Sequence, residues 1–150
     1  MADFYFTGVT LRSTDASGAW NYQLKSERVR HFPDNDRWEL AAPLMESYPD
    51  AGPPWYGQAE QGIVWPERDR VDLLGPVKMH RPAGPDNLPM QIDTADVRAY
   101  PSRDYAETDA PTRVRQNQSW LRGTGARAWL AEDRVEFLSN VKGRYVSEDQ

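Results

Sequence analysis

The chain has 150 residues, a net charge of −5 and no cysteine, so disulfides and thiolate metal sites are excluded. Its length predicts a single domain over residues 1–150 that buries about two thirds of the surface of the unfolded chain. Its basic residues are scattered and it has no long apolar run, which argues against nucleic acid as a partner and against a membrane-spanning segment within these residues.

The N-terminal residues alternate loosely between apolar and polar side chains, as in strands with one buried face. The apolar members are Phe4, Phe6, Val9 and Leu11 in a first strand and Trp20, Tyr22 and Leu24 in a second. Residues 14–18 are rich in small and polar side chains and supply a turn between them. This pattern predicts a β-hairpin at the N-terminus.

Four later segments superimpose without a gap: residues 32–44, 65–77, 100–112 and 129–141. Each starts with an aromatic residue, has Asp four residues on and an acid three residues after that. The shared columns are Phe32/Trp65/Tyr100/Trp129, Asp36/Asp69/Asp104/Asp133, Glu39/Asp72/Glu107/Glu136 and Pro43/Pro76/Pro111/Asn140. The Asp recurs at intervals of 33, 35 and 29 residues, which is typical of one supersecondary unit used repeatedly.

Each unit is predicted to be a strand, a tight turn, a second strand and then a bend at the Pro43-type position. Mostly apolar residues flank the shared acid with a period of two, which indicates a strand with one wet face. Pro33, Pro66 and Pro101 break any helix before it. Residues 126–138 alone would pass for a short helix, but their match to the other copies favours strand, turn, strand.

At the C-terminus, residues 135–145 are expected to form a last pair of strands. Both ends of the sheet would then be edges with unpaired backbone groups. The fold class that follows is all-β.

The sequence offers no catalytic residue, metal site or cofactor site. His31 and His80 lack the spacing of a metal-binding motif, and they are expected to be partly exposed strand residues. Acids are plentiful, so residue type alone leaves open a glycosidase pair such as Asp36 with Glu107. However, these acids belong to the repeated columns, which predicts a scaffold role and a protein that is not an enzyme.

A set of apolar residues falls on the inward side of the predicted strands, where it could fill a core or line a groove for an apolar ligand. Periodicity alone leaves both readings open. The residues are Leu24, Trp38, Leu40, Val71, Leu73, Met79, Ile92, Val97, Leu121, Val135 and Phe137.

Three stretches carry a resemblance to a known family. They are DFYF at residues 3–6, the pattern G-x-W-x-Y-x-L-x-S-x-x-V-x-H-F-P-D at residues 18–34, and LSNVKGRY at residues 138–145. In order and spacing the chain resembles the LptC family, the periplasmic component of the lipopolysaccharide export machinery of Gram-negative bacteria. Its repeat is similar to that of the wider LptA/OstA-like family.

The resemblance implies a twisted β-jellyroll, open at both ends, whose apolar groove holds the acyl chains of lipopolysaccharide. It also implies relay of that lipid from an inner-membrane ABC transporter (LptB, LptF, LptG) to the bridge protein LptA. The family's N-terminal membrane anchor is absent from these residues, and Met1-Ala2 looks like an expression start. We therefore expect a periplasmic domain that an N-terminal helix anchors to the inner membrane in the native protein.

The resemblance makes the two sheet edges candidates for partner binding by strand addition. The N-terminal edge would meet the transporter and the C-terminal edge would meet LptA. The same edges could pair two copies of the chain, which predicts a homodimer as a competing state. The edge candidates are Phe4, Phe6, Val9, Leu11, Val141 and Tyr145.

Two other classes stay open from the residues. A carbohydrate-binding β-jellyroll would use Trp20, Trp55 and Trp120 as sugar-stacking platforms if these side chains are exposed. A hydrolase on a β-roll would use paired acids.

Overall fold

The computed structural model describes residues 1–14, 20–48, 53–86, 88–132 and 134–147. The described residues form one ten-stranded sheet in which every paired neighbour is antiparallel. The strands are β1 (Phe4–Thr14), β2 (Trp20–Phe32), β3 (Arg37–Ala41), β4 (Leu44–Ser47), β5 (Trp55–Trp65), β6 (Arg70–Arg81), β7 (Met90–Tyr100), β8 (Tyr105–Gln116), β9 (Ser119–Trp129) and β10 (Arg134–Arg144). Short β3 and β4 share one place in the sheet, because both lie between β2 and β5.

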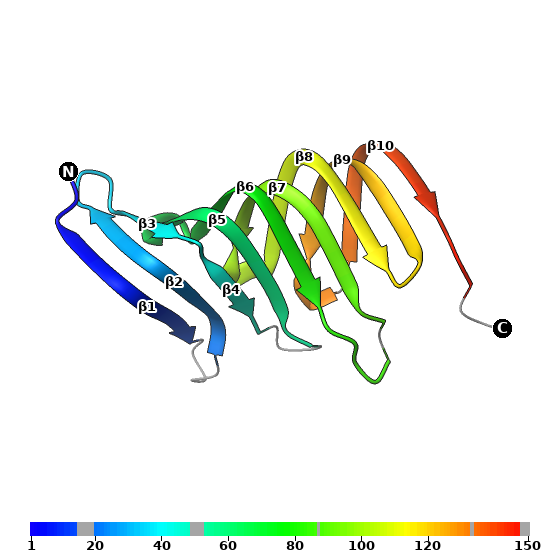
Figure 1. Ribbon diagram of the computed structural model, residues 1–150, viewed down its shortest axis with the longest axis horizontal. Coiled ribbons are helices and arrows are strands. Elements are labelled where there is room, and N and C mark those ends of the chain that lie inside the picture. Colours follow the sequence, from blue (N-terminus) through cyan, green and yellow to red (C-terminus); the bar gives the residue numbers. More distant parts are fainter. Residues whose placement is uncertain (15–19, 49–52, 87, 133, 148–150) are drawn as a thin grey trace.

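The strands lie side by side along the long axis of the molecule, with β1 at one end and β10 at the other (Figure 1). The sheet folds over into an open roll, and the chain termini lie at opposite ends because β1 and β10 are its two end strands (Figure 1). The all-β fold predicted from the repeats and the OstA-like open jellyroll implied by the family resemblance are both confirmed. Within the described ranges, no helix has the length and hydropathy that a membrane span needs.

The turns between strands follow the repeated Pro-x-x-Asp segments. In the second and third copies, three-residue 3-10 turns, η1 (Pro66–Arg68) and η2 (Pro101–Arg103), start with the repeated proline. Asp36, Asp69 and Asp104 follow with φ near +48°, a left-handed conformation that Asp tolerates better than most residues. The predicted strand-turn-strand unit is confirmed, and Asp133 of the fourth copy lies outside the described residues.

The fourth copy is also strand, turn, strand. Strand β9 leads into η3 (Leu130–Glu132), and β10 starts at Arg134. The helical alternative for residues 126–138 is therefore wrong. The expected strand pair at residues 135–145 is wrong as well, because β10 is one strand whose register shifts between Ser139 and Lys142. That irregularity, not a second turn, is what the sequence pattern around Asn140 marks.

The predicted bend is a row of irregularities in the middle of the sheet. Register shifts lie between Leu73 and Pro76 on β6 and between Thr108 and Pro111 on β8, and the break between β3 and β4 contains Pro43. A bulge bends a strand and increases its local twist, so a row of bulges folds the sheet over. The proline column therefore lies along the bend.

At the bend, side chains form hydrogen bonds with backbone groups that are not paired with a neighbouring strand. Asp96 Oδ1 accepts a hydrogen bond from the Gly75 amide at 2.9 Å, and the Thr108 hydroxyl donates to the Ala95 carbonyl at 2.6 Å. The Ser26 hydroxyl lies 2.8 Å from the Ala41 carbonyl. Because unpaired buried backbone groups are costly, these polar residues stabilise the folded-over shape.

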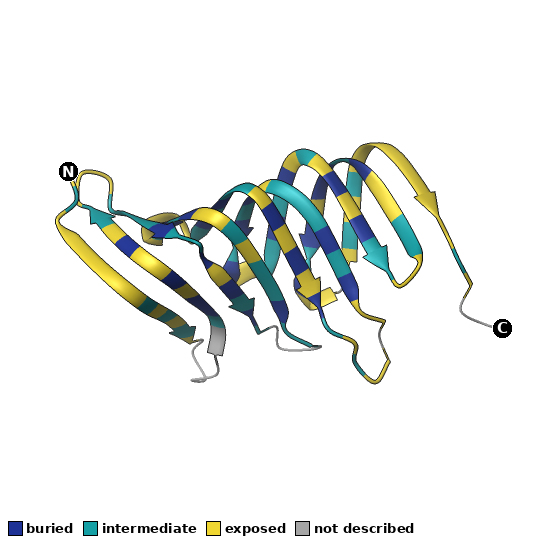
Figure 2. Cartoon of the chain, in the orientation of Figure 1, coloured by how far each residue is buried: buried dark blue, intermediate teal, exposed yellow. Residues whose placement is uncertain are grey.

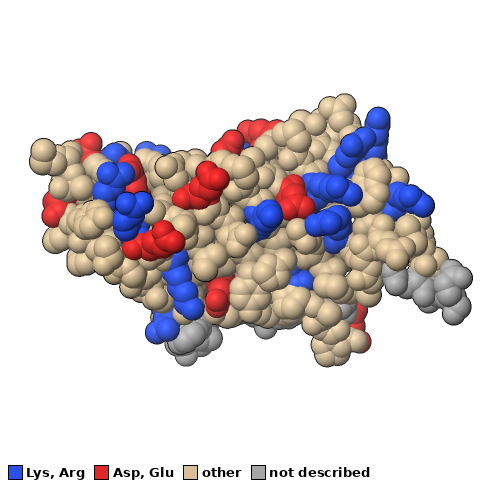
Figure 3. Space-filling view, viewed as in Figure 1, with Lys and Arg blue, Asp and Glu red and all other residues tan. Residues whose placement is uncertain are grey.

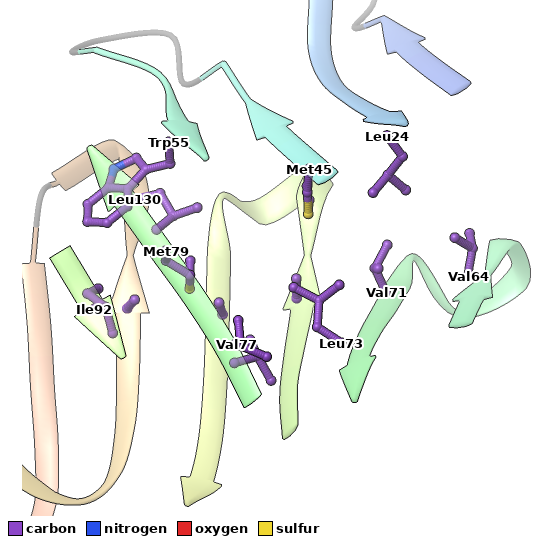
Figure 4. Close-up of a cluster of buried hydrophobic side chains, with 14 of the residues drawn as sticks. Leu24, Met45, Trp55, Val64, Val71, Leu73, Val77, Met79, Ile92 and Leu130 are labelled. Carbon is purple, nitrogen blue, oxygen red and sulfur yellow. The ribbon is translucent and has the colours of Figure 1, made fainter. Parts of the chain in front are cut away.

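The core lies between the folded-over halves of the sheet. Buried and exposed residues alternate along the central strands (Figure 2), and the buried side chains form one apolar cluster (Figure 4). No residue of β1 or β10 is buried. The predicted N-terminal hairpin is confirmed as the β1–β2 pair, while residues 15–18 of its predicted turn lie outside the described residues.

Candidate functional site

Seven of the eleven predicted groove residues are buried in the central cluster, each with 9% or less of its surface exposed. They are Leu24, Leu40, Val71, Leu73, Met79, Ile92 and Val97. They come from strands β2, β3, β6 and β7. Strand β5, which lies between β3 and β6, adds Trp55 and Val64 to the same cluster. The sequence pattern therefore identified residues of one apolar inner face, and in the structure that face is the core.

The remaining four predicted residues lie at the margins of this face. Trp38, Val135 and Phe137 are partly buried and pack against the central cluster. Leu121 is 47% exposed although it pairs with Val114, which is buried. It belongs to the inner face, at the C-terminal end where the roll opens.

The interior changes character between the centre and the C-terminal end. Strands β8 and β9 contribute mostly small side chains to the inner face: Ala106, Thr108, Thr112, Gly123, Ala126 and Ala128. Several of them line an apolar crevice of about 20 Å³ together with Met79 and Ile92. That space holds about one water molecule and is far too small for a lipid chain. Sequence reasoning missed this small-residue lining because alanine and threonine are weak hydrophobic signals.

A wider recess of about 460 Å³ opens at the C-terminal mouth of the roll. Its lining includes Val114, Leu121, Gly143 and Tyr145. Ligand pockets typically enclose about 300–1,000 Å³. Trp120 and Arg144, whose neighbours Leu121 and Gly143 are on the inner side, also line it, so the recess lies at the rim where the inner face ends.

Both end strands carry exposed apolar side chains. On β1, Phe4 is 51% and Phe6 is 48% exposed, while Val9 and Leu11 pack against the central cluster. At the other end, Val141 is 54% and Tyr145 is 83% exposed. The predicted edge residues thus lie on or next to the two terminal strands of the sheet.

The repeated acids form ion pairs with arginines near the turns. Glu39 pairs with Arg37 at 2.9 Å, and Asp72 pairs with Arg70 at 3.0 Å. In the third copy, Glu107 pairs with Arg98 at 2.7 Å. Because each carboxylate already has a cationic partner, these acids act as scaffold, as their repetition predicted.

Arginines also stack on the repeated aromatic column. The distance from guanidinium carbon to ring centre is 4.0 Å for Arg37 on Phe32 and 4.0 Å for Arg134 on Trp129. Arg103 lies 4.3 Å from the ring centre of Tyr100. Such cation–π contacts are worth about 0.5–1 kcal/mol at exposed sites. The repeat therefore carries an aromatic–arginine–acid ladder, whose arginines the sequence comparison did not single out.

His31 connects the N-terminal strand to the first turn. Its two ring nitrogens lie 2.7 Å from carboxylate oxygens of Asp3 and Asp36. These hydrogen bonds, the one to Asp36 first, raise the pKa of His31, because they favour the charged imidazolium. The other histidine, His80, is exposed and stacks on Tyr56. Among the described residues, no cluster of three potential metal ligands occurs.

The tryptophans offer little to a carbohydrate ligand. Trp55 is 2% exposed and belongs to the core, so its proposed role as a sugar platform is wrong. Trp120 is partly exposed, with Arg113 and Arg122 at 5.4 and 5.5 Å from its ring centre. The side chain of Trp20 lies outside the description.

Comparison with known proteins identifies the family. The family model described as "Lipopolysaccharide-assembly, LptC-related" matches residues 1–146. Among solved structures, the fold is similar to that of LptH from Pseudomonas aeruginosa, the LptA-homologous periplasmic component of the lipopolysaccharide transport device. That match has a TM-score of 0.67 and 7% identity, and covers 84% of this chain and 95% of that one. No curated protein matches the chain significantly. The chain therefore belongs to the LptC-related family of periplasmic lipopolysaccharide-transport proteins, whose members are not enzymes.

Proposed function

We propose that this chain holds the acyl chains of lipopolysaccharide against its inner apolar face and relays the lipid along the roll. The observation that carries the proposal is the continuity of that face. It runs from the buried residues of β2 and β3 through β6 and β7 to the exposed Leu121 at the C-terminal mouth. Burying one methylene is worth about 0.8 kcal/mol, so such a face can replace the bilayer as the host of a lipid tail.

Loading requires the roll to open. The crevice beneath β8 and β9 is too small for a chain of methylenes, and the central side chains are packed against one another. The end strands contain no buried residue, so they open at lower cost than the packed centre. Release to the next protein then reverses the opening, which suits a relay whose energy input comes from elsewhere.

The two sheet edges supply the partner contacts in this proposal. Lipid arrives from the inner-membrane ABC transporter (LptB, LptF, LptG) at the β1 edge, where Phe4 and Phe6 are exposed. It leaves to LptA at the β10 edge, next to Val141 and Tyr145. Strand addition provides backbone hydrogen bonds at either edge and keeps the inner faces of successive rolls in line.

A photo-crosslinking pair on β10 tests the proposal. Phe137 is half-buried on the inner side, and its chain neighbour Glu136 is 53% exposed at its side chain and faces Arg134. A crosslinker at Phe137 should capture lipopolysaccharide, whereas one at Glu136 should not. Equal labelling at both positions, or labelling at neither, would show that the inner face is not the lipid site.

A second crosslinking series tests the direction of relay. Crosslinkers at Val141 and Tyr145 should capture LptA, and crosslinkers at Phe4 and Phe6 should capture the transporter. Capture of LptA from β1 and not from β10 would reverse the assignment of the edges. Capture of a second copy of this chain at both edges would favour the homodimer.

A further inference from the structure

The outer side of the C-terminal strands carries two rows of side chains that run across the sheet. The first row consists of successive cross-strand partners on β7 to β10, namely Asp93, Arg113, Arg122 and Lys142. In the second row, the successive partners are Gln91, Arg115, Trp120 and Arg144. Lys and Arg side chains gather over this end of the molecule in the space-filling view (Figure 3).

This positive patch, defined as Arg113, Arg115, Arg122, Lys142 and Arg144, is poorly neutralised. Arg115 lies 3.7 Å from Asp93. In the described part of the chain, no ion pair joins a carboxylate to any of the other four cations. Like charges directly opposite each other on neighbouring strands are destabilising, and Arg113, Arg122 and Lys142 are three in succession.

The patch contrasts with the rest of the chain. Residues 111–146 contain seven Lys and Arg against three Asp and Glu, whereas the whole chain has a net charge of −5. Because most of these cations have no carboxylate partner among the described residues, an anionic partner that binds at this end would interact with them favourably. The guanidinium carbons of Arg113 and Arg122 lie 5.4 and 5.5 Å from the ring centre of Trp120.

Both rows end at the free edge of the sheet. Within the described sheet, β10 pairs with β9 alone, and Lys142 and Arg144 are the last members of the two rows. A strand added to β10 would continue these rows, with its outward side chains about 5 Å from Lys142 and Arg144. At those two positions of the incoming strand, negative side chains would therefore be favoured and positive side chains disfavoured.

A second copy of this chain is a poor match for that edge. In a head-to-tail stack that keeps the bends aligned, the half of β1 that contains Thr10 and Arg12 lies beside Lys142 and Arg144. Arg12 pairs with Gln23, and Thr10 pairs with Lys25 on β2. The stack therefore places the cations of one copy next to the patch of the other.

We propose that the β10 edge selects a partner strand that carries Asp or Glu at its outward positions opposite Lys142 and Arg144, and that it disfavours a second copy of the same chain. The inference rests on the proposed use of this edge for strand addition. It adds a criterion for the partner: carboxylates on the outer side of the docking strand.

Charge swaps within the chain itself provide the test, with sedimentation velocity as the readout. The variant R12E/K25E presents an acidic β1 side to the positive patch, and K142E/R144E presents an acidic edge to the basic β1 side. Each should strengthen head-to-tail self-association about tenfold at low salt, with the gain lost at high salt. Wild type and the combined four-fold variant should associate weakly, because each places like charges together.

The pattern of the four proteins decides the outcome. Weak association of wild type and the four-fold variant, with strong association of the two swaps, supports the selection. Equal association of all four would overturn it, as would binding of wild type to phosphatidylglycerol vesicles without any effect of the swaps on association. Circular dichroism of each variant confirms that it is folded.

The experiment contains neither lipopolysaccharide nor LptA. The charge selection can therefore fail while lipid capture at Phe137 succeeds, and lipid capture can fail while the selection holds. The two proposals are distinguishable by these separate readouts.

Discussion

The central strands and the two end strands share one sheet but differ in what holds them. In the centre, Leu73 and Val71 are 2% and 1% exposed and pack within the apolar cluster. Strands β1 and β10 contain no buried residue and pair with a single neighbour each. The end strands are therefore held by one backbone ladder and a few side-chain contacts.

Because of that difference, the centre provides most of the stability, and the two ends are the parts that open most easily. Burial of large apolar side chains is the main favourable term in folding, so the centre supplies most of the free energy of unfolding. Weakly buried strands open at lower cost than core strands. The proposed opening of the roll and strand addition are served by ends that can move without unfolding the centre.

The largest expected effect comes from the centre. Leu73→Ala should lower the free energy of unfolding by about 2–5 kcal/mol, because a fully packed side chain leaves a cavity. The matched control is Leu121→Ala on the same inner face, where 47% exposure predicts a loss below about 1.5 kcal/mol. Urea unfolding of both variants measures the contrast, and equal losses would refute a division between centre and end.

An intermediate effect is expected where β10 attaches to β9. A Cβ atom added at Gly123 would lie 2.7 Å from Cδ1 of Phe137, so Gly123→Ala should cost about 1–3 kcal/mol by overpacking. Hydrogen exchange should increase in β10 more than in β6. In the double variant with Phe137→Ala the contacts to the ring are absent and only the one to Cβ at 3.0 Å remains, so the two costs should not add. Additive costs would show that Phe137 does not fasten β10.

At the N-terminal end, the attachment of β1 should depend on pH. The two carboxylates raise the pKa of His31 above its ordinary value of 6.5, so the charged ring binds more tightly in the folded protein. Its stabilising contribution is complete below about pH 6.5 and is lost as the pH rises through the raised pKa. Thermal unfolding of wild type should show this loss, and His31→Gln should remove it. The same pH profile in both proteins would exclude His31 as the cause.

The smallest effect is expected on the outer ladder of the end strand. Glu136 and Arg134 lie 3.5 Å apart with about half of each side chain exposed, and exposed pairs are worth about 0–1 kcal/mol. Glu136→Gln should therefore change the free energy of unfolding by less than about 1 kcal/mol and leave lipid capture at Phe137 unchanged. A larger loss would mean that the ladder, and not the core, fastens β10.

Much of the local structure was predictable because the repeat combines residues with strong backbone preferences. Proline fixes its own φ and Asp tolerates the left-handed region, so Pro66 and Asp69 specify the turn in the second copy. Pro43, Pro76 and Pro111 mark the bend for the same reason. The inward residues of the central strands followed from alternation and are buried as predicted.

Other features depend on contacts that a single sequence does not reveal. Ile92 and Val97 are both buried, yet strict alternation would point residues five apart to opposite faces. The register shift between Asp93 and Arg98 reconciles them. The small lining of β8 and β9 and the arginine stacking on the aromatic column were likewise missed, because each becomes visible only when neighbouring strands are paired.

The row of bulges has a consequence for how this sheet can change in evolution. Each bulge lets the two halves of a strand set their inward positions independently, as Ile92 and Val97 do on β7. An insertion or deletion of one residue in an uninterrupted strand would move every later side chain to the wrong face. At a bulge, the same change can be absorbed where the ladder is already interrupted. Relatives of this chain should therefore differ in length at the bend more often than within either half of a strand.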